Sequence, residues 1–134
     1  MGDPVFVFGS NLAGRHGAGA AKWAKENRGA IYGRGVGLQG NSFAIPTKDG
    51  NLKTLPLDMI EAFVSKFITF AGLAQDMKFF VTPVGCGLAG YSPMQIAPLF
   101  RGATQNVALP DEFLLILDGP DYRPQQTDDF ARGN

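Results

Sequence analysis

The stretch VFVFGSNLAGRHGAG at Val5–Gly19 joins an apolar run to a glycine-rich loop. Its first four residues are wholly apolar, so Val5–Phe8 is predicted to be a buried strand that breaks at Gly9. The alanine-rich residues Ala20–Asn27 are predicted to form the next helix, which Gly29 ends. A glycine-rich loop that leads into a helix N-terminus is suited to bind an anion, because the backbone N–H groups there lack partners within the helix.

Two later segments carry helix signals. After Asp58, which is predicted to be an N-cap, apolar side chains recur at helical spacing over Ile60–Ala71 and predict an amphipathic helix. Ser92 and Pro93 supply an N-cap and a first-turn proline for a shorter helix that covers Ile96–Phe100.

Short apolar runs between turn residues predict the remaining strands. These runs are Ser42–Ile45, which Pro46 is expected to end, then Phe79–Thr82 and Phe113–Leu117, with Ile31–Tyr32 as a further short candidate. The segment Ala30–Asn41 is otherwise expected to be irregular, and Thr47–Leu55 is expected to be an exposed loop. Strands that alternate with helices predict one α/β domain over residues 1–119, with a mostly parallel mixed sheet covered on both faces. The polar residues 120–134 are expected to form a loose tail.

Composition narrows the class of protein. The chain has 134 residues, 45% of them hydrophobic and 18% charged, which suits one packed domain. Its net charge of zero argues against a broad surface for duplex nucleic acid. One cysteine and one histidine allow no internal disulfide and no metal site of the usual kind, so no metal or cofactor is expected. The chain shows no secretion signal and no membrane-spanning run, so we expect a cytoplasmic monomer.

The 18 glycines gather in clusters beside the strand-like runs. Two of these clusters, Gly9–Gly19 and Val84–Tyr91, follow predicted parallel strands. Ligands of such sheets bind beyond the carboxyl ends of the strands, so both loops are expected to flank one pocket for a phosphate-bearing nucleotide. The first loop is neither a P-loop nor the dinucleotide-binding fingerprint, because its glycine spacing differs and no Gly-Lys-Ser/Thr ending follows.

Several side chains near these loops have both a chemical and a structural interpretation. Lys48, just beyond a predicted strand, is either a nucleophile or anion ligand, or a solvated loop lysine. His16 either polarises a ligand hydroxyl or caps a turn, and Cys86 is either a nucleophile or a small buried side chain. Tyr91 and Phe8 could stack on a base or belong to the core.

Three motifs resemble those of macrodomains and occur in the same order. They are NLAGRHGAGAA at 11–21, Ile45–Lys48 (IPTK) and Val84–Gly90 (VGCGLAG). The chain is most similar to the branch typified by terminal ADP-ribose protein glycohydrolase and by the antitoxins that remove ADP-ribose from DNA. This resemblance implies a three-layer α/β/α fold. It also implies an ADP-ribose cleft in which Lys48 attacks the anomeric carbon and water resolves the covalent intermediate.

The resemblance and the loops together give a set of expected substrate-binding residues. They are Gly9, Ser10, Asn11, His16, Gly17, Ala18, Gly19, Val84, Gly85, Cys86, Gly87, Leu88, Ala89, Gly90 and Tyr91, with Lys48 as the catalytic residue. One departure is Ala89, which stands where the protein-directed hydrolase has an aspartate. Asp49 is not assigned that role, because neighbouring residues on an extended segment point apart.

Three functions remain open from the sequence. The first is an ADP-ribosyl glycohydrolase whose partner is ADP-ribosylated DNA or protein. The second is a non-catalytic reader of ADP-ribose, and the third is a protein that sequesters a free NAD-derived nucleotide. The ordered motifs make the first function the leading hypothesis. The missing aspartate is the reason to consider the second, and within the first it favours a nucleic-acid or non-carboxylate linkage.

Overall fold

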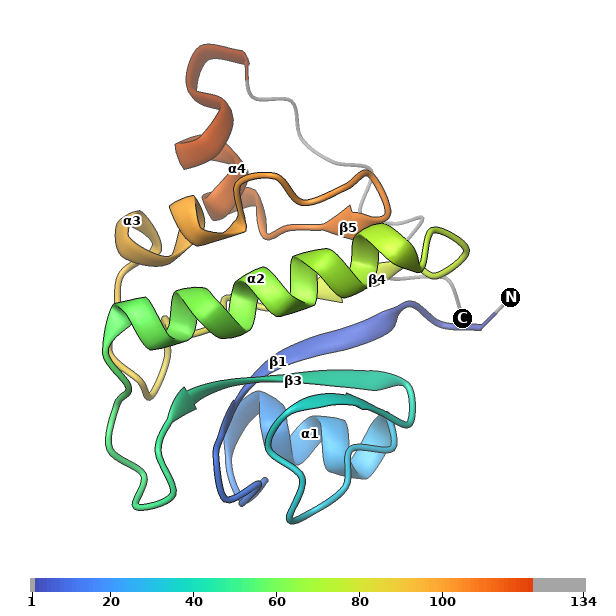
Figure 1. Ribbon diagram of the computed structural model, residues 1–134, viewed down its shortest axis with the longest axis vertical. Helices are drawn as coiled ribbons and strands as arrows, with labels where there is room; N and C mark the ends of the chain where they lie inside the picture. Colours follow the sequence, from blue (N-terminus) through green and yellow to red (C-terminus); the bar gives the residue numbers. More distant parts are fainter. Residues whose placement is uncertain (1, 122–134) are drawn as a thin grey trace.

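A computed structural model describes residues 2–121 of the chain (Figure 1). The elements, in chain order, are β1 Val5–Asn11, α1 Gly19–Asn27, β2 Gly37–Gln39, β3 Ser42–Lys48, α2 Leu57–Leu73, β4 Phe79–Val81, α3 Pro93–Ile96, the 3-10 helix η1 Ala97–Phe100, β5 Val107–Ala108, α4 Asp111–Asp118 and the 3-10 turn η2 Gly119–Asp121. Residues 122–134, most of the expected tail, lie outside the described residues. Within residues 2–121, no helix combines the length and the apolar composition that a membrane crossing requires.

The described strands form one five-stranded sheet in the order β2-β3-β1-β4-β5. The central strand β1 pairs in parallel with β3 and β4, and β4 pairs in parallel with β5. Only β2 runs antiparallel, beside β3. The predicted α/β class with a mostly parallel mixed sheet is therefore confirmed.

Alternate side chains of β1 pack on opposite faces of the sheet. Val5 and Val7 belong to the larger core cluster, which includes the buried side of α2. Phe8 belongs to a smaller cluster with Ala21 and Ala24 of α1. Figure 1 shows α1 and α2 on opposite sides of β1 and β3. β1 is therefore covered on both faces, and it is the central strand of the sheet.

The long helix α2 follows the predicted apolar stripe. Its buried residues are Ile60, Val64, Phe67 and Ala71, which share one face at helical spacing. The helix begins one residue before Asp58, however, and the N-cap is Pro56. The prediction of Asp58 as N-cap is therefore wrong. Its carboxylate lies in the first turn, where its negative charge interacts favourably with the positive end of the helix dipole.

The last predicted strand is wrong. Phe113–Leu117 lies within α4, and the final strand is β5, at Val107–Ala108. Five consecutive apolar residues suit a buried strand or a buried helix equally well. Asp111 and Glu112 in the first turn favour the helix, since acidic side chains stabilise a helix N-terminus.

Two strands run further than their sequences predict. β1 continues through Gly9 to Asn11, and β3 continues through Pro46 to Lys48. Pro46 pairs with Ser10, next to a shift in register between Ser10 and Asn11, where the ladder tolerates a missing N–H.

Two shorter predictions meet different outcomes. Ile31–Tyr32 lies in coil and turn, and the strand of that segment is β2. Ser92 is the N-cap of α3, as predicted. It forms a capping box in which its backbone N–H donates to Oε1 of Gln95 at 3.0 Å.

Candidate functional site

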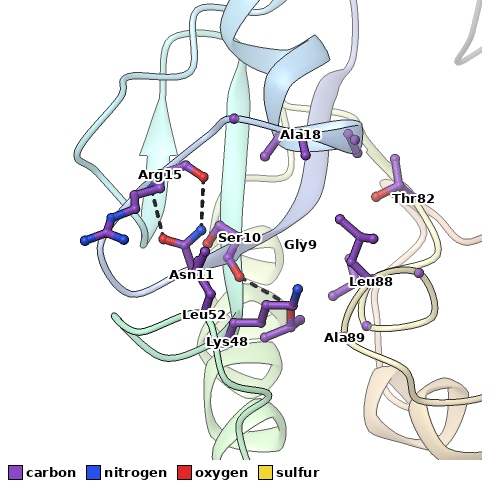
Figure 2. Close-up of a pocket in the computed structure, with 18 of the residues that line it drawn as sticks. Gly9, Ser10, Asn11, Arg15, Ala18, Lys48, Leu52, Thr82, Leu88 and Ala89 are labelled. Atoms are coloured by element: carbon purple, nitrogen blue, oxygen red, sulfur yellow. Dashed lines mark hydrogen bonds between the residues drawn. The ribbon is translucent and has the colours of Figure 1, made fainter.

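A cavity of about 520 Å³ lies beyond the carboxyl ends of β1, β3 and β4. This volume falls within the range of small-molecule sites. Both predicted glycine-rich loops line it, one between β1 and α1 and the other after β4 (Figure 2). Of the predicted residues, those that line it are Gly9, Ser10, Asn11, Gly17, Ala18, Gly19, Lys48, Val84, Gly85, Gly87, Leu88 and Ala89.

Seven further lining residues were not predicted from the sequence. They are Arg15, Ala20, Ala21, Thr47, Leu52, Thr82 and Pro83. Four of them, Arg15, Ala20, Ala21 and Thr47, lie inside the macrodomain-like motifs. Thr82 and Pro83 directly precede the third motif, so the whole motifs with their flanking residues would have included all six. Leu52 is the exception, because it lies in a turn that was interpreted as a solvated loop.

Four expected binding residues lie outside the cavity lining: His16, Cys86, Gly90 and Tyr91. His16 is fully buried, and its Nε2 lies 2.9 Å from the carbonyl of Arg34 and 3.2 Å from Oε1 of Gln39. This side chain therefore connects the first loop to the 34–39 segment, and the structure places it behind the cavity wall rather than in the lining.

Phe8 lies in the smaller hydrophobic cluster, and Tyr91 packs against the larger one. The Tyr91 hydroxyl donates to the carbonyl of Leu55 at 2.7 Å, and its ring packs against the larger cluster. Phe8 is fully buried beneath α1. No described lining residue of the cavity is aromatic, so aliphatic side chains provide its apolar surface.

Cys86 also belongs to the core side of its loop. Its Sγ lies 3.6 Å from the carbonyl of Val84, and its side chain packs against the larger cluster. Burial raises the pKa of the Cys86 thiol to about 11, and the nearby charge of Glu112 adds to the shift. The nucleophile is the thiolate, so this cysteine is unsuited to covalent catalysis near neutral pH.

This protonation state predicts slow alkylation of Cys86. At pH 8 we expect iodoacetamide to react about 100-fold more slowly with the native protein than with free cysteine, because the thiolate fraction is correspondingly small. The rate should rise about tenfold per pH unit until the pH approaches the thiol pKa of about 11. Alkylation followed by mass spectrometry measures it, with urea-unfolded protein as the control. Equal alkylation rates for native and unfolded protein at pH 8 would contradict the raised pKa of the partly buried Cys86 thiol.

Polar side chains at the cavity wall hydrogen-bond within the protein. The Ser10 hydroxyl donates to the carbonyl of Gly35 at 2.5 Å. The Asn11 side chain forms two hydrogen bonds with the backbone of Arg15. Its Nδ2 donates to the Arg15 carbonyl at 3.0 Å, and its Oδ1 accepts the Arg15 N–H at 2.9 Å. Thr47 and Thr82 donate to the carbonyls of Ser10 and Val7, at 3.3 and 2.7 Å. These groups shape the wall of the cavity.

Several residues that line the cavity have backbone N–H groups without an acceptor. In the first turn of α1, the N–H groups of Gly19, Ala20 and Ala21 have none among residues 2–121, and no side chain caps this helix. In the loop after β4, the same holds for the N–H groups of Gly85, Gly87, Leu88 and Ala89. Two sets of donors from different loops therefore border one cavity.

The charged side chains that line the cavity are basic. Lys48 and Arg15 are its charged residues, and no carboxylate is among the described lining residues. In Figure 2 the Arg15 guanidinium extends away from the loop that carries Leu88 and Ala89, whereas the Lys48 side chain extends toward it. Asp49 is turned back onto its own loop, where its carboxylate accepts the N–H groups of Asn51 and Lys53 at 2.8 and 3.0 Å. The site therefore offers hydrogen-bond donors and positive charge, which suit an anionic ligand.

Lys48 is fixed by the strand that carries it. It is the last residue of β3, it pairs with Asn11, and its carbonyl accepts the N–H of Leu12 at 3.0 Å. In Figure 2 its side chain extends along the cavity toward the loop that carries Leu88 and Ala89. No side chain of residues 2–121 forms an ion pair with its amine.

No protein family, curated protein or solved structure matches the chain. The geometry and charge of this cavity are therefore the evidence for its function.

Proposed function

We propose that the protein binds ADP-ribose, or a closely related NAD-derived nucleotide, in this cavity and hydrolyses ADP-ribosyl linkages through Lys48. The observation that carries the proposal is the pair of unpartnered N–H sets on opposite loops around a cavity whose charged residues are basic. A diphosphate carries negative charge on both phosphates and can accept hydrogen bonds from both loops at once. The three macrodomain-like motifs support the same ligand and a macrodomain-like three-layer fold.

The amine of Lys48 provides a chemical route for the hydrolysis. In its neutral form it attacks the anomeric carbon of the ADP-ribosyl group, and the bond from that carbon to the modified macromolecule breaks. The departing atom takes up a proton, and water then cleaves the bond between the lysine nitrogen and the sugar. Free ADP-ribose leaves and the lysine amine is restored. This lysine is held at a strand end beside both loops, as such a nucleophile requires.

Calorimetric titration with ADP-ribose, AMP and NAD tests the binding. We expect micromolar affinity for ADP-ribose and weaker binding of AMP, because AMP has one phosphate and reaches fewer of the N–H groups. NAD should also bind more weakly, because its nicotinamide occupies the anomeric position beside Lys48. No binding of ADP-ribose at millimolar concentration would overturn the proposal.

A second candidate function is a reader that binds ADP-ribose without cleaving its linkage. The absence of a carboxylate among the described lining residues favours it, because no acidic group is placed to move protons during cleavage. ADP-ribosylated DNA and ADP-ribosylated protein, each incubated with the protein, separate the two functions. Release of free ADP-ribose from either substrate excludes the reader, and binding of both without release supports it.

A further inference from the structure

The guanidinium of Arg15 is a charged group at the edge of the cavity that no protein group satisfies. Arg15 lines the cavity and is exposed, and its guanidinium extends away from the loop that carries Leu88 and Ala89 (Figure 2). Within residues 2–121 the guanidinium forms no hydrogen bond and no ion pair. Its five N–H donors are therefore free to bind a group outside the protein.

The backbone that carries this guanidinium is fixed on both sides. The buried side chain of Asn11 holds the N–H and the carbonyl of Arg15 through two hydrogen bonds. The carbonyl of Gly14 accepts the N–H of Gly33 at 2.8 Å, and an added Cβ at Gly14 would lie 2.3 Å from the backbone nitrogen of Arg34. Because the loop is already ordered, a ligand that binds Arg15 does not pay to order the backbone.

Arg15 belongs to the Lys48 end of the cavity. Asn11, whose side chain holds Arg15, pairs with Lys48 between β1 and β3. Under the proposed function Lys48 attacks the anomeric carbon, and that carbon carries the bond to the modified macromolecule. The diphosphate extends from the same sugar toward the N–H groups of the two loops. The macromolecule therefore begins at the end of the cavity where Arg15 lies.

The segment around Arg15 is basic although the whole chain has no net charge. Residues 12–41 include one carboxylate, Glu26, and five cationic side chains, namely Arg15, Lys22, Lys25, Arg28 and Arg34. This excess of positive charge beside the cavity suits an anionic partner. A nucleic-acid strand has a phosphate next to every nucleotide, whereas a protein has a carboxylate only where its sequence supplies one. The charge pattern therefore favours a nucleic-acid strand.

We infer that Arg15 is a specificity-determining residue that pairs with a backbone phosphate of an ADP-ribosylated nucleic-acid strand, next to the modified nucleotide. The inference rests on the proposed function, because it places the macromolecule relative to the anomeric carbon at Lys48. A guanidinium donates to two phosphate oxygens at once, which fixes the strand as well as attracting it. Arg15 thus recognises what ADP-ribose is attached to, and the two loops bind ADP-ribose itself.

Arg15→Ala tests this role in a Lys48→Ala background, which keeps the modified strand intact. A single-stranded DNA oligonucleotide with one ADP-ribosylated base should bind about tenfold more weakly after the Arg15 change. The slope of log affinity against log salt should become less steep by about 0.7, as for the loss of one phosphate contact on a single strand. Affinity for free ADP-ribose should change less than about twofold. Fluorescence anisotropy measures oligonucleotide binding, and calorimetry measures ADP-ribose binding.

Two further variants in the same background are controls. Arg15→Lys keeps the charge but donates to one phosphate oxygen at a time, so it should restore the salt slope and only part of the affinity. Lys66→Ala removes one positive charge from α2, which lies across the sheet from α1 and outside the cavity lining. It should leave both affinities unchanged.

Equal affinity for the modified oligonucleotide with and without Arg15 would overturn the inference and leave the proposed function intact. Equal loss for the oligonucleotide and for free ADP-ribose would place Arg15 on the nucleotide and would also overturn it. Loss confined to an ADP-ribosylated peptide would assign the anionic group to a protein and overturn the nucleic-acid strand. If wild type itself does not bind ADP-ribose, the proposed function fails first.

Discussion

Replacement of Lys48 by alanine should lower the rate of ADP-ribose release from a modified macromolecule at least about 1,000-fold, because no other nucleophile replaces the amine. Affinity for free ADP-ribose should fall by no more than about tenfold, since the N–H groups of both loops remain. Release is measured by chromatography of the freed nucleotide under single-turnover conditions, and affinity by calorimetry.

Two variants make the Lys48 experiment specific. Lys53→Ala removes a nearby lysine that does not line the cavity and should leave both rate and affinity unchanged. Lys48→Arg keeps the positive charge but lacks the amine nucleophile, so it should bind ADP-ribose and remain inactive. If Lys48→Ala releases ADP-ribose at the wild-type rate, Lys48 is not the nucleophile. If Lys48→Arg is active, the side chain acts through its charge alone.

Replacement of Gly35 by alanine should destabilise the fold and the site together. An added Cβ would lie 2.0 Å from the carbonyl oxygen of Asn11 and 3.1 Å from the carbonyl carbons of Asn11 and Leu12. These are backbone atoms at the end of β1, so the 33–36 segment or the strand end must move. We expect the free energy of unfolding to fall by about 3 kcal/mol, as for overpacked sites. Urea denaturation followed by circular dichroism measures this change.

Gly50→Ala is the control for Gly35→Ala. A Cβ at Gly50 meets nothing within 4 Å, so its free energy of unfolding should change by less than about 0.5 kcal/mol. Gly35→Ala should also weaken ADP-ribose binding, because Asn11 holds the backbone of Arg15 at the cavity wall. Equal unfolding curves for the two variants would show that the 33–36 segment adjusts at little cost.

The elements that could be predicted are those whose signal is local. The stripe of α2 repeats at helical spacing along the chain, and the capping residues of α3 are adjacent in sequence. The two glycine-rich loops were also predictable, because glycines gather beside apolar strand sequences. Their presence around one cavity follows from the parallel arrangement of β1 and β4.

The predictions that failed depend on distant partners. β3 continues through Pro46 to Lys48 because it pairs with β1, a partner that the local sequence does not reveal. The apolar run at Phe113 has no period that separates helix from strand, so packing decides its structure. The burial of His16 could not be predicted locally either, because its hydrogen-bond partner Gln39 lies 23 residues away.

Ligand binding is coupled to folding, because the cavity forms around the central strand β1 and its neighbours in the sheet. The cavity takes its wall from segments 9–21, 47–52 and 82–89, which meet only when the parallel sheet has formed. The unfolded chain therefore has no site, and a ligand stabilises the folded state by mass action. At 100 times its dissociation constant a nucleotide adds about 2.7 kcal/mol to the free energy of unfolding. A thermal-shift screen of NAD-derived metabolites would consequently rank candidate ligands without labels and without an activity assay.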